Sequence, residues 1–438
     1  MKSYGASLPC PAASKFAALG LAFLFVLAAC STEDLPECDD GQRLEGSVCI
    51  CEDTLQPPIA GMCGKPMSLP PLNANVVDSG GDTGRGLSMV LDNRDYPHLA
   101  YYEANSGDLR YATLIRETGS WRIETVDSIG DVGKYPSIAL YNPEATVRPV
   151  IVYYDETQRS LKGAFRSADG WQVRYLDPEQ GGSTLRDLGT YTSMVIEQGE
   201  SQIAHIAYID VQGRNLMYLR WNLDRGEVST PRLVDAGFTN IGGREYGSGV
   251  IGEYTSIALN PQGEPVIAYR DVKLGDLKIA VYNENDDRWT TQFVDNNPLV
   301  EINYADTGMH SSLAIDDLGN YHVSYHNRSD LSLRYGHFDG SQWSLETVER
   351  GSVGRFTSIA LRDDRTPIIA YHDFSRGAAK LAHKRRDGRW QIEFAATQGN
   401  PGFYMRLALT SEGWPAIAYQ EFFARRVLFD FVTWTVFQ

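Results

Sequence analysis

Short runs of alternating apolar and polar residues follow one another along most of the chain, and four kinds of run recur in a fixed order. The first is Gly-x-aromatic-x-Ser followed by three apolar residues, as in GKYPSIAL at Gly133 and GRFTSIAL at Gly354. The second ends in Tyr-x-acid, the third is short and apolar, and the fourth usually begins with tryptophan. Their β-branched and aromatic residues, bounded by Gly, Asp, Asn or Pro, are typical of strands.

This set of four runs occurs seven times within residues 72–438, and no part of this body has a helical period of useful length. Four short antiparallel strands in each of seven repeats predict an all-β fold, a seven-bladed β-propeller with four-stranded blades. Residues 73–78 match the end of a fourth run but lack the first three. We therefore expect this segment to pair in the last blade, where it would close the ring and remove an exposed sheet edge.

An apolar run at residues 16–29 precedes the repeats and is too short for a comfortable membrane span. It ends in Leu-Ala-Ala-Cys, which resembles the lipobox of bacterial lipoproteins. The resemblance implies that residues 1–29 are a signal peptide and that Cys30 carries lipid. It also implies an exported protein anchored to a membrane, expected to be the outer membrane of a Gram-negative bacterium, in the periplasm or at the cell surface. The alternative is an ordinary cleaved signal that leaves Cys30 as an odd thiol.

Residues 30–71 form a Pro-rich linker with four further cysteines, while residues 72–438 contain none. Clustered cysteines in a short Gly- and Pro-rich stretch predict a disulfide staple in an oxidising compartment, with three possible pairings. The C-x-C at Cys49 and Cys51 resembles the second half of an EGF-like module, which implies the pairs Cys38–Cys49 and Cys51–Cys63. A zinc site is the alternative, and both the lack of a nearby histidine and the expected export disfavour it.

The chain has a formal net charge of −16, so it lacks the basic field that nucleic-acid binding needs. We expect no nucleic-acid partner and no cofactor. Three turns before the fourth run, such as Asp387-Gly388-Arg389-Trp390, resemble the Asp-box turn of sialidases without its full pattern. The blade layout is also similar to that of fungal and bacterial fucose-binding lectins. Both resemblances concern the blade pattern and imply the fold more than a function.

Residues that recur in every repeat are expected to serve folding, because a catalytic group is needed only once. The acid that ends the second run is expected to cap its own turn. The repeated serines are expected to pack near the central channel, and none of them lies in a Gly-x-Ser-x-Gly elbow. The tryptophans are expected to pack between neighbouring blades.

Function is better sought where the repeat is broken. Three connections between blades are long, at residues 178–188, 236–251 and 296–307, and long loops on a rigid scaffold commonly carry binding. Nearby, Arg or His precedes the repeated acid. These features predict a polar ligand pocket on the top face, where the first and second runs meet, although simple surface drift would also explain them. The candidate ligand-binding residues are Arg244, Tyr246, Arg270, Asp271, Glu301, Tyr304, His310, His326 and His372.

No metal site is predicted, because the spacing of the three histidines in the sequence does not indicate one. The uniform repeats, the anchor and the lack of a catalytic motif favour a non-catalytic binding module that recognises a glycan or a protein. One alternative is a glycoside hydrolase or lyase of the sialidase-like propeller type, with Glu245, Glu301 and Asp306 as candidate carboxylates. The other alternative is a structural scaffold in an envelope complex.

Overall fold

The structure of the protein is a computed structural model. It describes residues 75–141, 148–176, 187–197, 199, 202–236, 250–272, 274–295, 306–385 and 387–432. It also describes the backbone of residues 42–45, 48–51, 239–241 and 244–246. The predicted signal peptide lies outside the described residues, and so do the candidates Cys30, Cys38, Cys63, Glu301 and Tyr304. Of Glu245 the structure describes the backbone alone.

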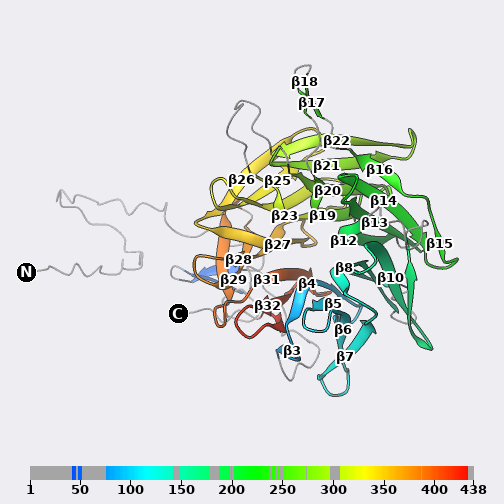
Figure 1. Ribbon diagram of the computed structural model, residues 1–438. Helices are drawn as coiled ribbons and strands as arrows, with labels where there is room; N and C mark the ends of the chain where they lie inside the picture. The colour runs from blue at the N-terminus through cyan, green and yellow to red at the C-terminus, as the bar shows by residue number, and fades with distance from the viewer. Residues whose placement is uncertain are drawn as a thin grey trace, which may run out of the picture.

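Seven antiparallel sheets stand around a central axis, so the fold is the predicted seven-bladed β-propeller (Figure 1). The elements of the described residues are all strands. Blade 1 consists of β4 (Thr83–Leu91), β5 (Pro97–Glu103), β6 (Asp108–Leu114) and β7 (Trp121–Asp127). Blade 2 consists of β8 (Val132–Tyr141), β9 (Arg148–Asp155), β10 (Ser160–Ser167) and β11 (Gly170–Tyr175). Blade 3 consists of β12 (Leu188–Glu197), β13 (Ile203–Asp210), β14 (Asn215–Asn222) and an outer strand in two pieces, β15 (Glu227–Val228) and β16 (Arg232–Asp235).

The remaining blades follow in chain order. Blade 4 consists of β19 (Ile251–Leu259), β20 (Pro265–Asp271), β21 (Asp276–Asn283) and β22 (Arg288–Asp295). Blade 5 consists of β23 (Met309–Ile315), β24 (Tyr321–Asn327), β25 (Ser332–Phe338) and β26 (Trp343–Arg350). Blade 6 consists of β27 (Val353–Leu361), β28 (Pro367–Asp373), β29 (Ala378–Lys384) and β30 (Trp390–Ala396). Blade 7 consists of β31 (Phe403–Leu409), β32 (Pro415–Glu421), β33 (Arg426–Phe431) and β3 (Val76–Asp78).

Blade 7 closes the ring with strands from both ends of the propeller. Strand β3 pairs antiparallel with β33, with Val76 opposite Leu428, and supplies the fourth strand of the blade. This confirms that the segment before the first repeat pairs in the last blade. The backbone amide of Thr83 also donates to the carbonyl of Arg425, 2.9 Å away, and joins blade 1 to blade 7.

Two short hairpins lie outside the blades. Strands β1 (Gln42–Glu45) and β2 (Val48–Cys51) pair antiparallel, and β2 contains Cys49 and Cys51. Strands β17 (Thr239–Ile241) and β18 (Arg244–Tyr246) pair in the long connection between blades 3 and 4. No helix in the described part of the chain is long and apolar enough to cross a membrane.

The core lies between neighbouring blades. The second strand of a blade is buried along its length, as β5 and β20 show. Each hydrophobic cluster joins two blades; one, for example, combines Leu109 and Tyr111 of blade 1 with Ile138 and Tyr153 of blade 2. Burial of apolar surface between sheets therefore drives both blade folding and ring assembly.

The glycine that opens each first strand is required by this close packing. Gly133 has a φ of 98°, which residues with a side chain rarely adopt. A Cβ atom at this position would lie 2.7 Å from the Cα of Leu109 in blade 1. Only glycine therefore lets the first strand of blade 2 approach blade 1 this closely.

Hydrogen bonds between blades use the other repeated residues. Six serines accept the amide hydrogen of the next blade's first strand, as Ser137 does from Met194 at 3.0 Å. The complete set of accepting serines is Ser88, Ser137, Ser193, Ser256, Ser312 and Ser358. The predicted structural role of these serines is thereby confirmed.

The tyrosine of the second run and the acid at the end of the fourth run also pair across blades. The hydroxyl of Tyr153 donates to Asp127 of blade 1 at 2.7 Å, and Lys162 bridges Asp127 and Asp155 at 3.0 and 2.8 Å. Tyr371 and Lys380 repeat this arrangement in blade 6. Buried carboxylates are thus kept satisfied at the blade junctions.

The tryptophan of the fourth run packs against the preceding blade, as predicted. The ring of Trp171 lies edge-on to Tyr111 of blade 1, with centroids 5.2 Å apart. Trp390 packs in the same way on Tyr335 of blade 5.

Candidate functional site

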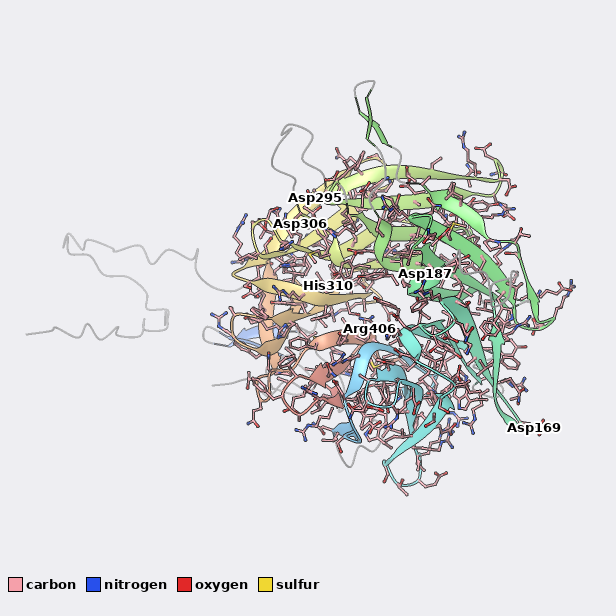
Figure 2. All side chains as sticks on the ribbon, viewed as in Figure 1. Asp169, Asp187, Asp295, Asp306, His310 and Arg406 are labelled. Carbon is pink, nitrogen blue, oxygen red and sulfur yellow. The ribbon has the colours of Figure 1, made fainter. Side chains whose placement is uncertain are left out.

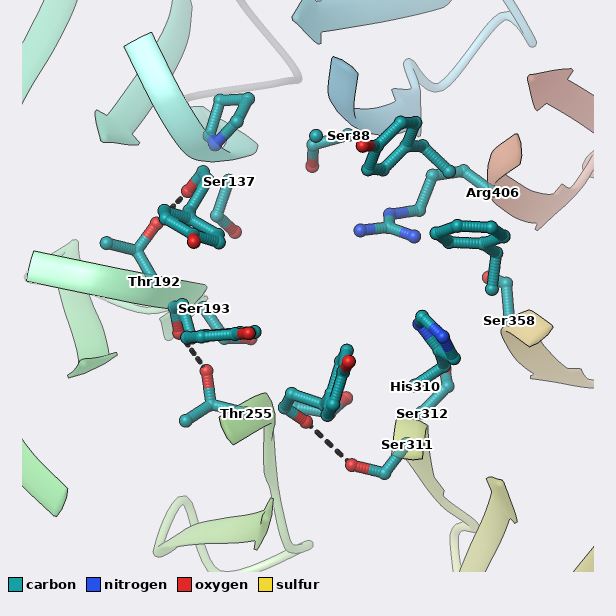
Figure 3. A pocket seen from close by; sticks show the side chains of 18 of the residues that line it. Ser88, Ser137, Thr192, Ser193, Thr255, His310, Ser311, Ser312, Ser358 and Arg406 are labelled. Atoms are coloured by element: carbon teal, nitrogen blue, oxygen red, sulfur yellow. Dashed lines mark hydrogen bonds between the residues drawn. The ribbon is translucent and has the colours of Figure 1, made fainter. Parts of the chain in front are cut away.

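The first strands of all seven blades surround a cavity of about 520 Å³ on the propeller axis (Figure 3). Its wall contains the six serines described above and the aromatic position of the first run, which lies two residues before each serine. This size falls in the range of small-molecule sites.

Aromatic side chains at six of the seven equivalent positions form a ring that is open at blade 1. Neighbouring ring centroids lie 4.5 to 5.2 Å apart around the series Tyr135, Tyr191, Tyr254, His310, Phe356 and Tyr404. All six residues have a φ between 51° and 56°, a left-handed conformation that is uncommon for residues with side chains. This conformation places each of the six rings in the wall of the axial cavity.

Hydroxyls of the next blade hold this backbone in place. Ser311 donates to the carbonyl of Tyr254 at 2.6 Å, and Thr192 and Thr255 donate to the equivalent carbonyls of the preceding blades. In blade 1 the aromatic position is Gly86, which leaves a gap in the ring between Tyr404 and Tyr135.

Blade 7 breaks the serine ring with Arg406. The guanidinium reaches toward the middle of the cavity, and both Arg406 and His310 lie near the propeller axis (Figures 2 and 3). It donates to the carbonyl of Met405 at 2.8 Å. Loss of solvation lowers the pKa of Arg406 to about 10, so it stays charged at neutral pH.

His310 faces the same cavity without charge. Burial, together with the nearby His326, Arg355 and Arg406, lowers the pKa of His310 to about 3. The imidazole is therefore neutral at neutral pH and can accept or donate a hydrogen bond. Among the described residues that line the cavity, Arg406 is the sole charged side chain.

A second hollow, of about 480 Å³, adjoins the first on the top face of blades 6, 7 and 1. Phe356 and Tyr404 line both spaces, so the two are neighbours. The residues that line the second hollow are Asp82, Arg85, Phe356, Phe403, Tyr404, Gln420, Phe422, Phe423 and Arg425.

An exposed phenylalanine patch borders this hollow. Phe422 and Phe423 follow the acid of blade 7 and are 48 % and 74 % exposed, and Phe374 follows the acid of blade 6 and is 51 % exposed. Phe403 stacks on Phe422 with centroids 4.8 Å apart. The guanidinium of Arg355 lies over the ring of Phe374 at 4.3 Å. Contiguous exposed aromatic surface of this kind usually marks an interaction site.

Arg270 and Asp271, the predicted candidates of blade 4, form ion pairs and turn hydrogen bonds within the protein. Arg270 is 7 % exposed and pairs with Glu253 at 2.9 Å and Asp306 at 2.7 Å. Asp271 is buried and accepts the amide of Leu274 in its own turn, as predicted for the repeated acid.

Of the three predicted histidines, two are buried in structural contacts and one lines the axial cavity. His326 is buried and its Nδ1 lies 2.8 Å from the carbonyl of Val353. His372 is buried beneath the phenylalanine patch, with its ring 4.6 Å from that of Phe403 and its Nε2 3.0 Å from the side-chain oxygen of Asn400. His310, by contrast, lines the axial cavity.

The candidates on the long loops are described less fully. Arg244 and Tyr246 lie in β18, of which the structure describes the backbone. Glu301 and Tyr304 lie outside the described residues. The structure thus brings His310 and His372 next to the two hollows, while Arg270, Asp271 and His326 lie within blade junctions and turns.

Sequence reasoning missed Arg406 and the phenylalanine patch, although both are visible as breaks in the repeat. The first run of blade 7, GFYMRLAL, has arginine where six repeats have serine. The second run is followed by Phe374 in blade 6 and by Phe422 and Phe423 in blade 7, and by smaller or polar residues elsewhere. Comparison of equivalent positions, rather than of loop lengths, would have found them.

Three top-face carboxylates of the described residues are engaged with neighbours. Asp131 accepts from Tyr102 at 2.7 Å and from Lys134 at 2.9 Å, and Asp187 accepts from Tyr154 at 2.7 Å. Asp306 pairs with Arg270 and Arg328. In this part of the chain no three His, Cys, Asp or Glu side chains are arranged to hold a metal ion.

No family model matches the chain, and no curated protein matches it. Among solved structures, a mutant of the Aleuria aurantia lectin in complex with Fucα1-6GlcNAc has a TM-score of 0.45 and 11 % identity, over 71 % of this chain and 95 % of the lectin. The polysaccharide lyase Uly1 has a TM-score of 0.49 and 11 % identity, over 82 % and 91 %. A protein of unknown function from Dyadobacter fermentans has 0.48 and 9 %, over 82 % and 97 %.

Proposed function

We propose that the protein is a non-catalytic binding module that recognises a glycan through the top face of blades 6, 7 and 1. The observation that carries this proposal is the phenylalanine patch beside the second hollow. Phe423 is 74 % exposed on a turn that has a small or polar residue in most other blades. Folding gains nothing from an aromatic ring left in water, so a bound partner is the better explanation of the patch.

The chemistry of the patch suits a sugar. The apolar C–H face of a pyranose packs on an aromatic ring through dispersion and the hydrophobic effect. Its hydroxyls need hydrogen-bonding groups at the edge of that ring. Arg85 and Arg425 supply donors, with side chains 50 % and 65 % exposed, and both contact the buried carboxylate of Asp82.

The engaged carboxylates support a non-catalytic role. Hydrolysis of a glycoside by the usual mechanism needs two carboxyl groups free to act on one bond. Asp131, Asp187 and Asp306 are each occupied by hydroxyl or cationic neighbours. A binding function needs none of them to be free.

The test uses the soluble body from residue 72 on a glycan array, with turnover of chromogenic glycosides measured in parallel. We expect glycan binding without turnover, and a loss of binding of about tenfold or more in Phe422→Ala/Phe423→Ala. The matched control is Leu318→Ala, which removes a side chain that is 65 % exposed in the turn between the first two strands of blade 5, on the opposite face. Binding unaffected by the double variant would place the site elsewhere, and turnover would overturn the non-catalytic role.

We also propose that Cys30 is acylated and holds the propeller at the outer membrane. The support is the Leu-Ala-Ala-Cys sequence at the end of the apolar run. Expression with an alkyne fatty acid should label the full chain, and the Cys30→Ser variant should lose the label and leave the membrane fraction. A labelled variant, or unchanged processing in the presence of globomycin, would contradict lipidation at this cysteine.

A further inference from the structure

The axial cavity differs from the rest of the repeat in one charged residue. Six blades present a serine to the axis, and blade 7 presents Arg406. We propose that Arg406 binds a carboxylate of the ligand, so that the glycan recognised by this protein is an acidic saccharide. This inference rests on the proposed glycan binding at the adjacent patch.

Arg406 has no carboxylate partner among the described residues. Its one hydrogen bond there is the one to the carbonyl of Met405, at 2.8 Å. A guanidinium has five N–H donors, so four remain for a ligand. On a chain with a net charge of −16, Arg406 thus differs from Arg85 and Arg270, two other arginines of the top face, each of which pairs with an acid.

The cavity wall around Arg406 favours an anion over a cation. No aspartate or glutamate of the described chain lines it. Each of the six repeated serines of the wall accepts an amide hydrogen of the next blade, as Ser358 does from Leu407 at 3.0 Å, which leaves its own hydroxyl hydrogen to donate. The wall therefore offers hydroxyl donors and one fixed cation.

A carboxylate fits this geometry better than a neutral group. The planar guanidinium forms two parallel hydrogen bonds with a carboxylate, and such bonds are roughly twice as strong as neutral ones. Blade 1, which has Gly86 at the aromatic position, adds no ring between Tyr135 and Tyr404, the aromatic residue of the same strand as Arg406. The two hollows are neighbours because Phe356 and Tyr404 line both, so a sugar on the phenylalanine patch would extend past these rings to reach Arg406.

The repeat itself provides the variant that tests this role. Arg406→Ser introduces the residue that six blades carry at this position, so it is expected to fold. The matched control is Arg389→Ser, which removes a 74 % exposed arginine from the outer hairpin of blade 6. Circular dichroism and thermal unfolding of each variant establish that it is folded before binding is measured.

Binding is measured by calorimetry with three probes that differ at one group: methyl glucuronide, the corresponding glucuronamide and methyl glucoside. We expect the glucuronide to bind most tightly, and we expect Arg406→Ser to weaken it by about 10- to 100-fold while Arg389→Ser leaves it unchanged. Equal binding of the three probes, or full binding of the glucuronide to Arg406→Ser, would overturn the inference.

Two further outcomes separate this inference from the proposed function. If the array shows binding of neutral glycans that depends on the phenylalanine patch and not on Arg406, the binding module stands and the acidic specificity falls. If no glycan binds, acetate and benzoate are titrated against the wild type and Arg406→Ser. If these anions protect the wild type but not Arg406→Ser against thermal unfolding, the carboxylate site stands and the glycan ligand is refuted. If they protect neither protein, the carboxylate site and the glycan ligand are both refuted.

Discussion

Asp276 should make the propeller less stable as pH rises from about 4 to about 7. It opens the third strand of blade 4 directly opposite Asp271 and is 8 % exposed. Burial raises the pKa of Asp276 to about 7, and the carboxylates of Asp271 and Asp295 contribute. Blade 3 has Asn215 at the equivalent position, opposite Asp210, so Asp276→Asn is a substitution that the repeat already accommodates.

The size of the effect follows from linkage. Below pH 3.8 the carboxyl is protonated in both the folded and the unfolded chain and contributes nothing. As pH rises, the unfolded chain ionises first, so the free energy of unfolding falls until the folded carboxyl also ionises near pH 7. The difference between about 7 and 3.8 corresponds to about 4 kcal/mol above pH 8, and to about 2 kcal/mol at pH 5.

Urea unfolding followed by tryptophan fluorescence measures this difference. Asp276→Asn should exceed the wild type in free energy of unfolding by about 2 kcal/mol at pH 5 and about 4 kcal/mol at pH 8. Asp169→Asn, in an exposed turn at the periphery (Figure 2), should change it by less than about 0.5 kcal/mol at either pH. The same difference at both pH values, or a wild type that is the more stable protein at pH 8, would refute the reasoning.

Three more predictions concern the repeat, each measured by urea unfolding. Gly133→Ala should cost about 3 kcal/mol or more, whereas Gly170→Ala, at a φ of 112° but with open space around it, should cost only about 1 to 2 kcal/mol of backbone strain. Tyr371→Phe should cost about 2 kcal/mol, because Glu349 loses a hydrogen bond between blades. Arg406→Ser should raise stability by about 1 kcal/mol or more, since a serine can accept the amide hydrogen of the next blade and no cation is desolvated.

The fold was predictable because each blade repeats the same local solution. The alternation of apolar and polar residues predicts the strands. Gly133 with its equivalents packs against the neighbouring blade in the same way in each repeat, and so does the tryptophan of the fourth run in several repeats. Ring closure was predictable because residues 73–78 looked like a fourth strand without a blade, and β3 indeed pairs with β33. Because the pattern occurs seven times, a residue that departs from it in one repeat does not hide it.

The candidate site was only partly predictable, for a physical reason. Long loops are visible in a sequence, but their side chains can be used for structure, as Asp306 is in its ion pair with Arg270 of β20. The importance of Arg406 depends on its facing the axis together with residues of six other blades, and the left-handed conformation that turns the aromatic rings inward cannot be seen in the residue types. His310 was named from the sequence because it replaces a repeated tyrosine, which is a break at an equivalent position.

The same breaks explain how a nearly symmetric ring can bind an asymmetric ligand. Seven equal blades offer seven equivalent positions around the axis, and a ligand smaller than the ring cannot use them equally. Gly86 removes one aromatic ring, and Arg406 adds one charge in the neighbouring blade, which also carries the exposed Phe422 and Phe423. These departures fall together at the junction where blade 7 meets blade 1. Arg406 lowers the expected stability of that junction and gains no acid partner among the described residues, which is the pattern expected of a residue retained for binding rather than for folding.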